Sequence, residues 1–333
     1  MDEILVEEYR GKLLECVHRG YICVTGEDGK IMYSVGNPNF ITYMRSSAKP
    51  IQVLPLLVRN LDSKFNFSDK EVTVMAASHR AQPWHVKAIE GIMSKTGISE
   101  ENLICLPTYP LSAEAKEEIL RNGGTKRRIY HNCSGKHMGI LTLCDSIGCD
   151  KSMYWHIDSP AQQEILNYVS LISEYPKDKI VIGTDGCGVP VFGMPMKYLA
   201  NAYRRLACPD TIKNVDISNA VKKLTKLMNE NYEMISGTNL ICTLLNEDNN
   251  IVAKGGAKGV YCFGLKDERI GISIKITDGS EEEWPIIVAA ILEELNYKNK
   301  ETINRLRKVY PTTVINDNEK VVGESKVVFN LKK

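Results

Sequence analysis

Hydrophobic residues near the N-terminus fall in short runs that are typical of β-strands. Residues 13–17 and 21–24 form two such runs, and the sequence Gly-Glu-Asp-Gly at 26–29 supplies a turn after them. Short apolar runs bounded by turn residues predict strands rather than helices. We therefore expect a β-hairpin or meander between residues 4 and 34.

The middle of the chain has the spacing of amphipathic helices. Apolar residues recur every three or four positions over 51–58 and again over 86–93, where Gly97 is placed as a C-cap. The same reasoning predicts further helices at 113–120, at 136–144, from Pro160 onward, at 197–207 and at 217–228.

Strand-like runs return toward the C-terminus. Residues 259–263 and 270–276 predict a pair of strands, and a short buried strand is expected at 179–183. A long helix is expected at 281–295. Ser280 is placed as its N-cap, and three acidic residues fill its first turn, where the helix dipole favours negative charge.

This order of elements predicts the fold class. Strands at both ends of the chain, around a helical middle, indicate an α+β fold in which the N-terminal and C-terminal strands share one sheet. The sequence contains no internal repeat and no low-complexity linker. We therefore expect residues 1–333 to form a single domain.

Composition and charge narrow the class of partner. Hydrophobic residues make up 43% of the chain and charged residues 25%, while the formal net charge is only +1. Such a balance predicts no binding of nucleic acid or of an anionic membrane, and it favours a small-molecule substrate. The acidic N-terminus is unlike a secretory signal, so we expect a cytoplasmic protein whose ten cysteines are reduced thiols.

A serine and a lysine three residues apart form the first candidate for chemistry. Ser46 and Lys49 share one face of a helical turn, and a desolvated lysine can take the proton of a serine hydroxyl. Such a loose tetrad occurs by chance about once in a chain of this length. The alternative of a capping serine and a solvated lysine therefore stays open.

Several other segments gather reactive side chains around turns. Ser78 and His79 follow the strand-like run 72–75, where the alternative is a turn serine and a structural histidine. Residues 131–137 combine a thiol, an amine, an amide and two imidazoles, and residues 183–188 present a carboxylate and a thiol. Their spacing alone does not predict a metal site, because no paired C-x-x-C is present.

Taken in order, these segments resemble the class 3, rhizobial-type L-asparaginases, also called the asparaginase II family. The matching segments are 10–11, 18–20, 45–50, 77–79, 132–137, 185–188, 236–238 and 253–257. The resemblance implies a fold similar to serine β-lactamases and glutaminases, with a sheet flanked by helices. It also implies hydrolysis of L-asparagine to L-aspartate and ammonia, and a homodimer.

The resemblance assigns roles to ten residues. It implies two Ser-Lys tandems, the first of Ser46 with Lys49 and the second of Ser78 with Lys254. It implies a zinc ion on Cys133, Lys136 and Cys187, and contacts with the substrate for Arg45, His137 and Asp185. From the chemistry of these ligands we expect the zinc to support the site rather than to act as a Lewis acid.

The sequence departs from the family pattern at two places, neither of which removes an assigned catalytic or metal residue. Arg80, Ala81 and Gln82 stand where the family usually has a small polar residue, Gly and Glu, and His131 replaces a common Asn. A cation at position 80 could alter a lysine pKa or the pocket. The alternatives are a glutaminase or another β-lactamase-like amide hydrolase, and a non-catalytic zinc or thiol module.

Overall fold

The computed structural model describes residues 1–333, and its largest element is an eight-stranded sheet. The strands follow the order β10-β11-β1-β2-β9-β8-β7, and β3 pairs with β2. Their bounds are β1 (Glu3–Arg10), β2 (Leu13–Thr25), β3 (Ile31–Val35), β7 (Ile251–Gly255), β8 (Val260–Leu265), β9 (Ile270–Ile276), β10 (Thr313–Ile315) and β11 (Val321–Val327). The N-terminal and C-terminal strands thus share one sheet, as predicted.

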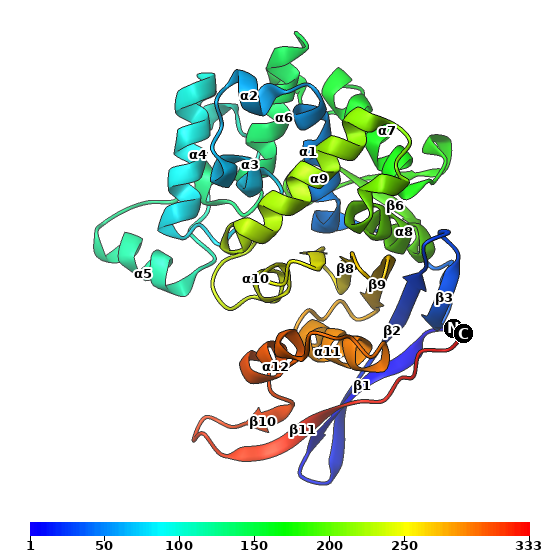
Figure 1. The fold of residues 1–333 in the computed structure, drawn as a ribbon. Helices are drawn as coiled ribbons and strands as arrows, with labels where there is room; N and C mark the ends of the chain where they lie inside the picture. Colours follow the sequence, from blue (N-terminus) through cyan, green and yellow to red (C-terminus); the bar gives the residue numbers. More distant parts are fainter.

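Most of the helices lie between β3 and β7 in the sequence. They are α1 (Lys49–Val58), α2 (Leu61–Lys64), α3 (Asp69–Met75), α4 (Pro83–Thr96), α5 (Ala113–Arg121), α6 (Ser134–Ser146), α7 (Pro160–Ser173), α8 (Met196–Ala207), α9 (Val215–Glu230) and α10 (Ile241–Asn246). They gather on one side of β7, β8 and β9, while α11 (Trp284–Glu294) and α12 (Lys300–Val309) cover the other side (Figure 1). The predicted α+β fold, with a sheet flanked by helices, is confirmed.

Helix α8 packs closely on the sheet because two strand residues have no side chain. A Cβ atom on Gly264 would lie 2.3 Å from the carbonyl oxygen of Tyr203, and one on Gly271 would lie 2.0 Å from that of Ala200. Real Cβ atoms essentially never approach so closely, so only glycine permits this contact between helix and sheet.

We expect Gly271→Ala to destabilise the protein by about 1–3 kcal/mol, because the new methyl group must push α8 away from the sheet. Urea denaturation of the variant and of the wild type measures this difference. Gly186→Ala is a matched control, since a Cβ there meets nothing within 4 Å. Equal unfolding free energies for the two variants would contradict a close contact between α8 and the sheet.

A second, three-stranded sheet positions two loops of the site. Its order is β4-β6-β5, with β4 at Ile41–Tyr43, β6 at Pro190–Pro195 and β5 at Val181–Thr184. Arg45 follows β4 and Asp185 follows β5. The strand predicted at 179–183 is therefore present, but it is a largely exposed edge strand rather than a buried one.

The strand-like run at 72–75 is helical, which corrects the prediction made for it. It forms the end of α3, whose start is fixed by a capping box in which the Ser68 backbone N–H donates to Glu71 Oε2 at 2.7 Å. The β-branched residues of the run are buried in the core, and this packing outweighs their strand preference. Ser78 consequently follows a helix, not a strand.

The helix predicted at 281–295 begins three residues later, at Trp284. Glu283 is its N-cap residue, and Pro285 lies in the first turn, where a proline is easily accommodated. Ser280 does not cap the helix, because its hydroxyl donates to the carboxylate of Glu283 instead. Glu283 is therefore a buried carboxylate at the start of α11.

One pair of cysteines is oxidised, whereas the sequence predicted ten reduced thiols. Cys144 and Cys149, at the C-terminal end of α6, form a disulfide, and their Cα atoms lie 5.1 Å apart. The other eight cysteines are free thiols, seven of them buried. None of the helices combines the length and apolar character needed to cross a bilayer.

Candidate active site

One cavity of about 530 Å³ collects the segments that the sequence singled out. Loops after β4, α3 and β5 meet there with the end of β7 and the start of α11. Its wall includes seven of the ten assigned residues, namely Arg45, Ser46, Ser78, Cys133, Asp185, Cys187 and Lys254. A neighbouring cavity of about 560 Å³ shares Arg80 and Leu240 with it but contains none of these seven residues.

Lys49 lies directly behind the cavity wall and contacts a serine. Its side chain is fully buried in the first turn of α1, and its Nζ is 2.9 Å from Ser78 Oγ. The same nitrogen donates to the carbonyl oxygens of Ala77, at 2.7 Å, and Asn132, at 3.2 Å. Burial lowers the pKa of Lys49, which favours the neutral amine that a base requires.

Lys254 is the second buried lysine of the site. It lies on β7 at the cavity wall, only 1% exposed, and its Nζ donates to the carbonyl oxygen of Gly255 at 2.7 Å. Burial lowers the pKa of Lys254 to about 8. The hydrogen bonds therefore differ from the expected tandems, since the lysine in contact with Ser78 is Lys49 rather than Lys254.

A charge pair marks one end of the cavity. Arg45 Nε lies 2.9 Å from Asp185 Oδ1, and Arg45 adopts a left-handed backbone conformation with φ of 53°. Burial alone would raise the pKa of Asp185, but the positive charges of Lys136 and Arg45 lower it below its ordinary value. Asp185 is thus an ionised carboxylate beside a guanidinium.

The three residues assigned to zinc converge behind this pair. Cys133, Lys136 and Cys187 are each at most 5% exposed, and Lys136 Nζ lies 3.0 Å from Cys187 Sγ. A hydrogen bond from Cys133 lowers the pKa of Cys187 to about 5; burial opposes this shift and Lys136 supports it. Burial would lower the pKa of Lys136, but the interactions of Lys136 with Cys187 and Cys133 raise it.

This donor set fits zinc. Two thiolates and one nitrogen are ligands that zinc accepts, and three protein ligands with one open position are typical of zinc sites that face a cavity. Cys133 and Cys187 both border the cavity. Lys136 can join them only as a neutral amine, so binding of the metal must release its proton.

His79 and His137 are both fully buried. His79 accepts from the Ala81 backbone N–H at 3.1 Å and lies 2.9 Å from Ser134 Oγ, so both ring nitrogens are engaged. His137 Nδ1 lies 2.6 Å from Tyr154 Oη, and burial lowers the pKa of His137 to about 3. His137 is not part of the cavity wall, so its contact with the substrate stays a prediction.

The family model for L-asparaginase II matches residues 6–327. The chain belongs to the L-asparaginase II family. A comparison with proteins of curated function finds no match.

Solved structures similar to this family member are distant. A putative β-lactamase from Bacteroides dorei is 12% identical with a TM-score of 0.46, covering 83% of this chain and 93% of that one. A β-lactamase from Mycobacterium bovis is 13% identical with a TM-score of 0.43, covering 83% and 94%. A Bacillus glutaminase is 12% identical with a TM-score of 0.38, covering 84% and 92%.

The cavity of this L-asparaginase II family member also includes residues that sequence reasoning gave no role. Arg80, noted only as a departure from the family pattern, borders both cavities. Further wall residues are His131, Ser236, Cys242, Glu281, Trp284 and Tyr310. Tyr310 had no sequence signal, because it follows α12, a helix that was not predicted.

Proposed function

We propose that the protein is an L-asparaginase that uses serine nucleophiles assisted by buried lysines. Its family membership supports the broader class, an amidohydrolase. The observation that carries the proposal is the 2.9 Å contact between Lys49 Nζ and Ser78 Oγ, beside a cavity that also contains Ser46 and Lys254. Buried lysines next to serine hydroxyls supply the nucleophile and base that amide hydrolysis requires.

The charge pair supports a free amino acid as the substrate. Arg45 can bind an α-carboxylate through its guanidinium, and Asp185 can accept from an α-ammonium. The two side chains lie 2.9 Å apart, so they offer opposite charges to the two adjacent charged groups on one Cα atom. A cavity of about 530 Å³ has ample room for the short side-chain amide of asparagine.

The proposed reaction has two stages. A serine hydroxyl attacks the carbonyl carbon of the side-chain amide, and its proton passes to the neighbouring lysine amine. The C–N bond then breaks as the lysine returns this proton to the departing nitrogen, which leaves as ammonia and yields an aspartyl ester on the serine. Water attacks the ester with the same lysine as base, releasing L-aspartate and restoring the serine.

Zinc on Cys133, Lys136 and Cys187 would support the site. Bound there, the ion contributes positive charge and fixes the positions of its ligands, a supporting rather than Lewis-acid role. The loop with Cys187 also carries Asp185, so a fixed Cys187 holds this carboxylate in place. The cytoplasmic location and the homodimer stay predictions.

Activity should rise with pH, because a lysine accepts a proton only as a neutral amine. Burial first, and then the charges of Lys49 and Arg80, lower the pKa of Lys254 to about 8, while Cys242 and Cys133 oppose this shift. Raising the pH through about 8 therefore increases the neutral fraction. We expect kcat/KM to increase between about pH 6 and pH 9, and a flat profile would contradict a buried lysine as the proton acceptor.

Ammonia release by the purified protein, measured in parallel with L-asparagine and L-glutamine, tests the proposed function. We expect release from L-asparagine at a higher kcat/KM than from L-glutamine. Preferential release from L-glutamine would support the glutaminase alternative. No release from either amide by folded, zinc-loaded protein would contradict the assignment and favour the non-catalytic module.

A further inference from the structure

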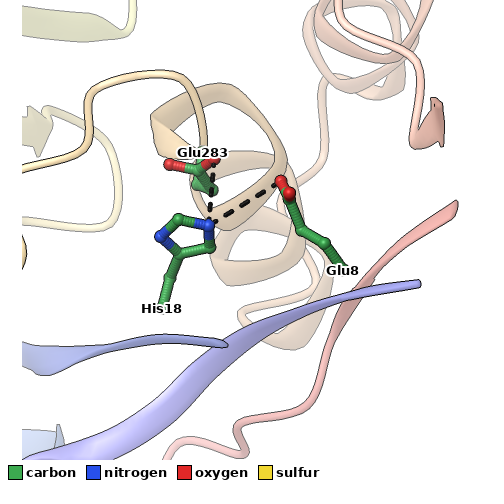
Figure 2. A group of neighbouring side chains, drawn as sticks. All are labelled: Glu8, His18 and Glu283. Carbon is green, nitrogen blue, oxygen red and sulfur yellow. Dashed lines mark ion pairs between the residues drawn. The ribbon is translucent and has the colours of Figure 1, made fainter. Parts of the chain in front are cut away.

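A histidine and two glutamates meet outside the active-site cavity. Glu8 on β1, His18 on β2 and Glu283 at the start of α11 point toward one another (Figure 2). His18 Nε2 lies 3.7 Å from Glu8 Oε1 and 3.5 Å from Glu283 Oε1, and the three atoms lie within 4.8 Å of one another. None of these residues belongs to the cavity wall.

The other ring nitrogen of His18 fixes how the imidazole is oriented. His18 Nδ1 lies 2.8 Å from Asp278 Oδ2. An ionised carboxylate only accepts hydrogen bonds, so Nδ1 must carry the proton and donate to Asp278. This leaves Nε2, the nitrogen that metal ions bind, directed at Glu8 and Glu283. A carboxylate on the far nitrogen is the usual support of a metal-binding histidine.

The two glutamates have no other cation beside them. His18 is the one basic side chain within ion-pair distance of either Glu8 or Glu283. His18 Nε2 is buried without a hydrogen-bond partner, and 3.5 Å is too long for a strong hydrogen bond to a carboxylate. Glu283 is only 4% exposed, and a cation beside so deeply buried a carboxylate would stabilise its ionised form.

The spacing of the three atoms suits a small divalent ion. Zinc binds imidazole nitrogen and carboxylate oxygen at about 2.1 Å, and the corners of such a tetrahedron lie about 3.4 Å apart. The observed separations of 3.5 and 3.7 Å are close to this value. We propose that Glu8, His18 and Glu283 form a second metal site, for a divalent ion of the zinc type, with Asp278 as the positioning residue for His18.

Such an ion would connect the sheet to the rim of the active-site cavity. Glu283 lies in the loop before α11, between Glu281 and Trp284, which are both part of the cavity wall. Glu8 and His18 lie on paired strands of the large sheet. Metal binding would therefore hold this part of the rim against β1 and β2, which makes the site structural rather than catalytic.

Zinc titration by calorimetry tests the proposal, after the thiol ligands of the other candidate site have been removed. The parent is Cys133→Ser/Cys187→Ser, which we expect to bind one equivalent of Zn²⁺. Adding His18→Gln should abolish this binding, and adding Asp278→Asn should weaken it by roughly 10–100-fold. Glu7→Gln, on the same strand as Glu8 but hydrogen-bonded to Tyr9, is the control and should leave the affinity unchanged.

Zinc content gives an independent reading if the parent variant does not fold. After equilibrium dialysis against Zn²⁺, we expect wild-type protein to hold one equivalent more than His18→Gln. Equal zinc contents of these two proteins would overturn the proposal. So would a folded Cys133→Ser/Cys187→Ser parent that binds no Zn²⁺, or one that binds it equally well after His18→Gln has been added.

Discussion

Lys49→Ala is expected to lower kcat/KM for L-asparagine by about 10³-fold, with most of the loss in kcat. The variant removes the amine that lies 2.9 Å from Ser78 Oγ, so the hydroxyl loses its partner for proton transfer. It does not touch Arg45 or Asp185, which we propose to bind the substrate. Steady-state ammonia release, with KM measured separately, checks both parts of this expectation.

Two further variants test whether the loss in Lys49→Ala comes from its contact with Ser78. Lys30→Ala removes an exposed lysine whose side chain is 83% accessible, so its kcat should equal that of the wild type. Ser78→Ala removes the other partner of the same contact, so the double variant with Lys49→Ala should be little worse than either single one. Additive losses would mean that the two groups act independently and share no proton-transfer step.

Asp185→Asn is expected to lower kcat/KM for L-asparagine by about 100-fold, mainly through a higher KM. The variant keeps the shape of the side chain but removes the charge that we propose for the α-ammonium group, and a charge-assisted hydrogen bond contributes about 1.5–3 kcal/mol. The kinetics are measured with L-asparagine and with succinamic acid, which is the same amide without the ammonium group. The wild type should strongly prefer L-asparagine, and the variant should lose most of that preference.

The zinc content of Asp185→Asn has to be measured alongside its kinetics, because Asp185 lies near Lys136 and in the same loop as Cys187. Equal zinc contents in variant and wild type assign the loss to substrate binding. If the variant retains the full preference for L-asparagine over succinamic acid, Asp185 does not bind the ammonium group.

The fold was largely predictable because its elements carry strong local signals. The helices at 51–58 and 86–93 show clear apolar periodicity, and Gly97 ends the second one in a left-handed conformation, with φ of 70°. The error at 72–75 has a local cause as well. The β-branched residues there suggested a strand, whereas the decisive signal was the capping box of Ser68 and Glu71.

The residues that line the cavity were easier to predict than the hydrogen bonds between them. The motifs around Ser46, Ser78 and Lys254 marked turns, and turns from several elements meet at one cavity. The partner of each lysine depends on packing between segments far apart in the sequence. Lys49 is three residues from Ser46, yet its hydrogen-bonded hydroxyl belongs to Ser78, 29 residues away, because α1 and the end of α3 pack together.

Other features could not be inferred from sequence because they depend on burial. Nothing in the sequence around His137 indicates that its pKa falls to about 3. This low pKa follows from the burial of His137, which lies on α6 and is not exposed to solvent. The cluster of Glu8, His18 and Glu283 likewise joins the two ends of the chain. Glu283 lies more than 260 residues from both Glu8 and His18 in the sequence, so only the folded structure reveals the cluster.

Detection of a covalent intermediate tests the proposed serine mechanism most directly. Wild-type protein is mixed with L-asparagine, quenched in acid within the first turnovers, digested and analysed by mass spectrometry. We expect an ester-linked aspartyl group on the peptide containing Ser46 or on the one containing Ser78, absent from Lys49→Ala. Rapid ammonia release with no adduct on either serine would contradict the serine mechanism, provided that the adduct is also absent under conditions that slow hydrolysis of the aspartyl ester.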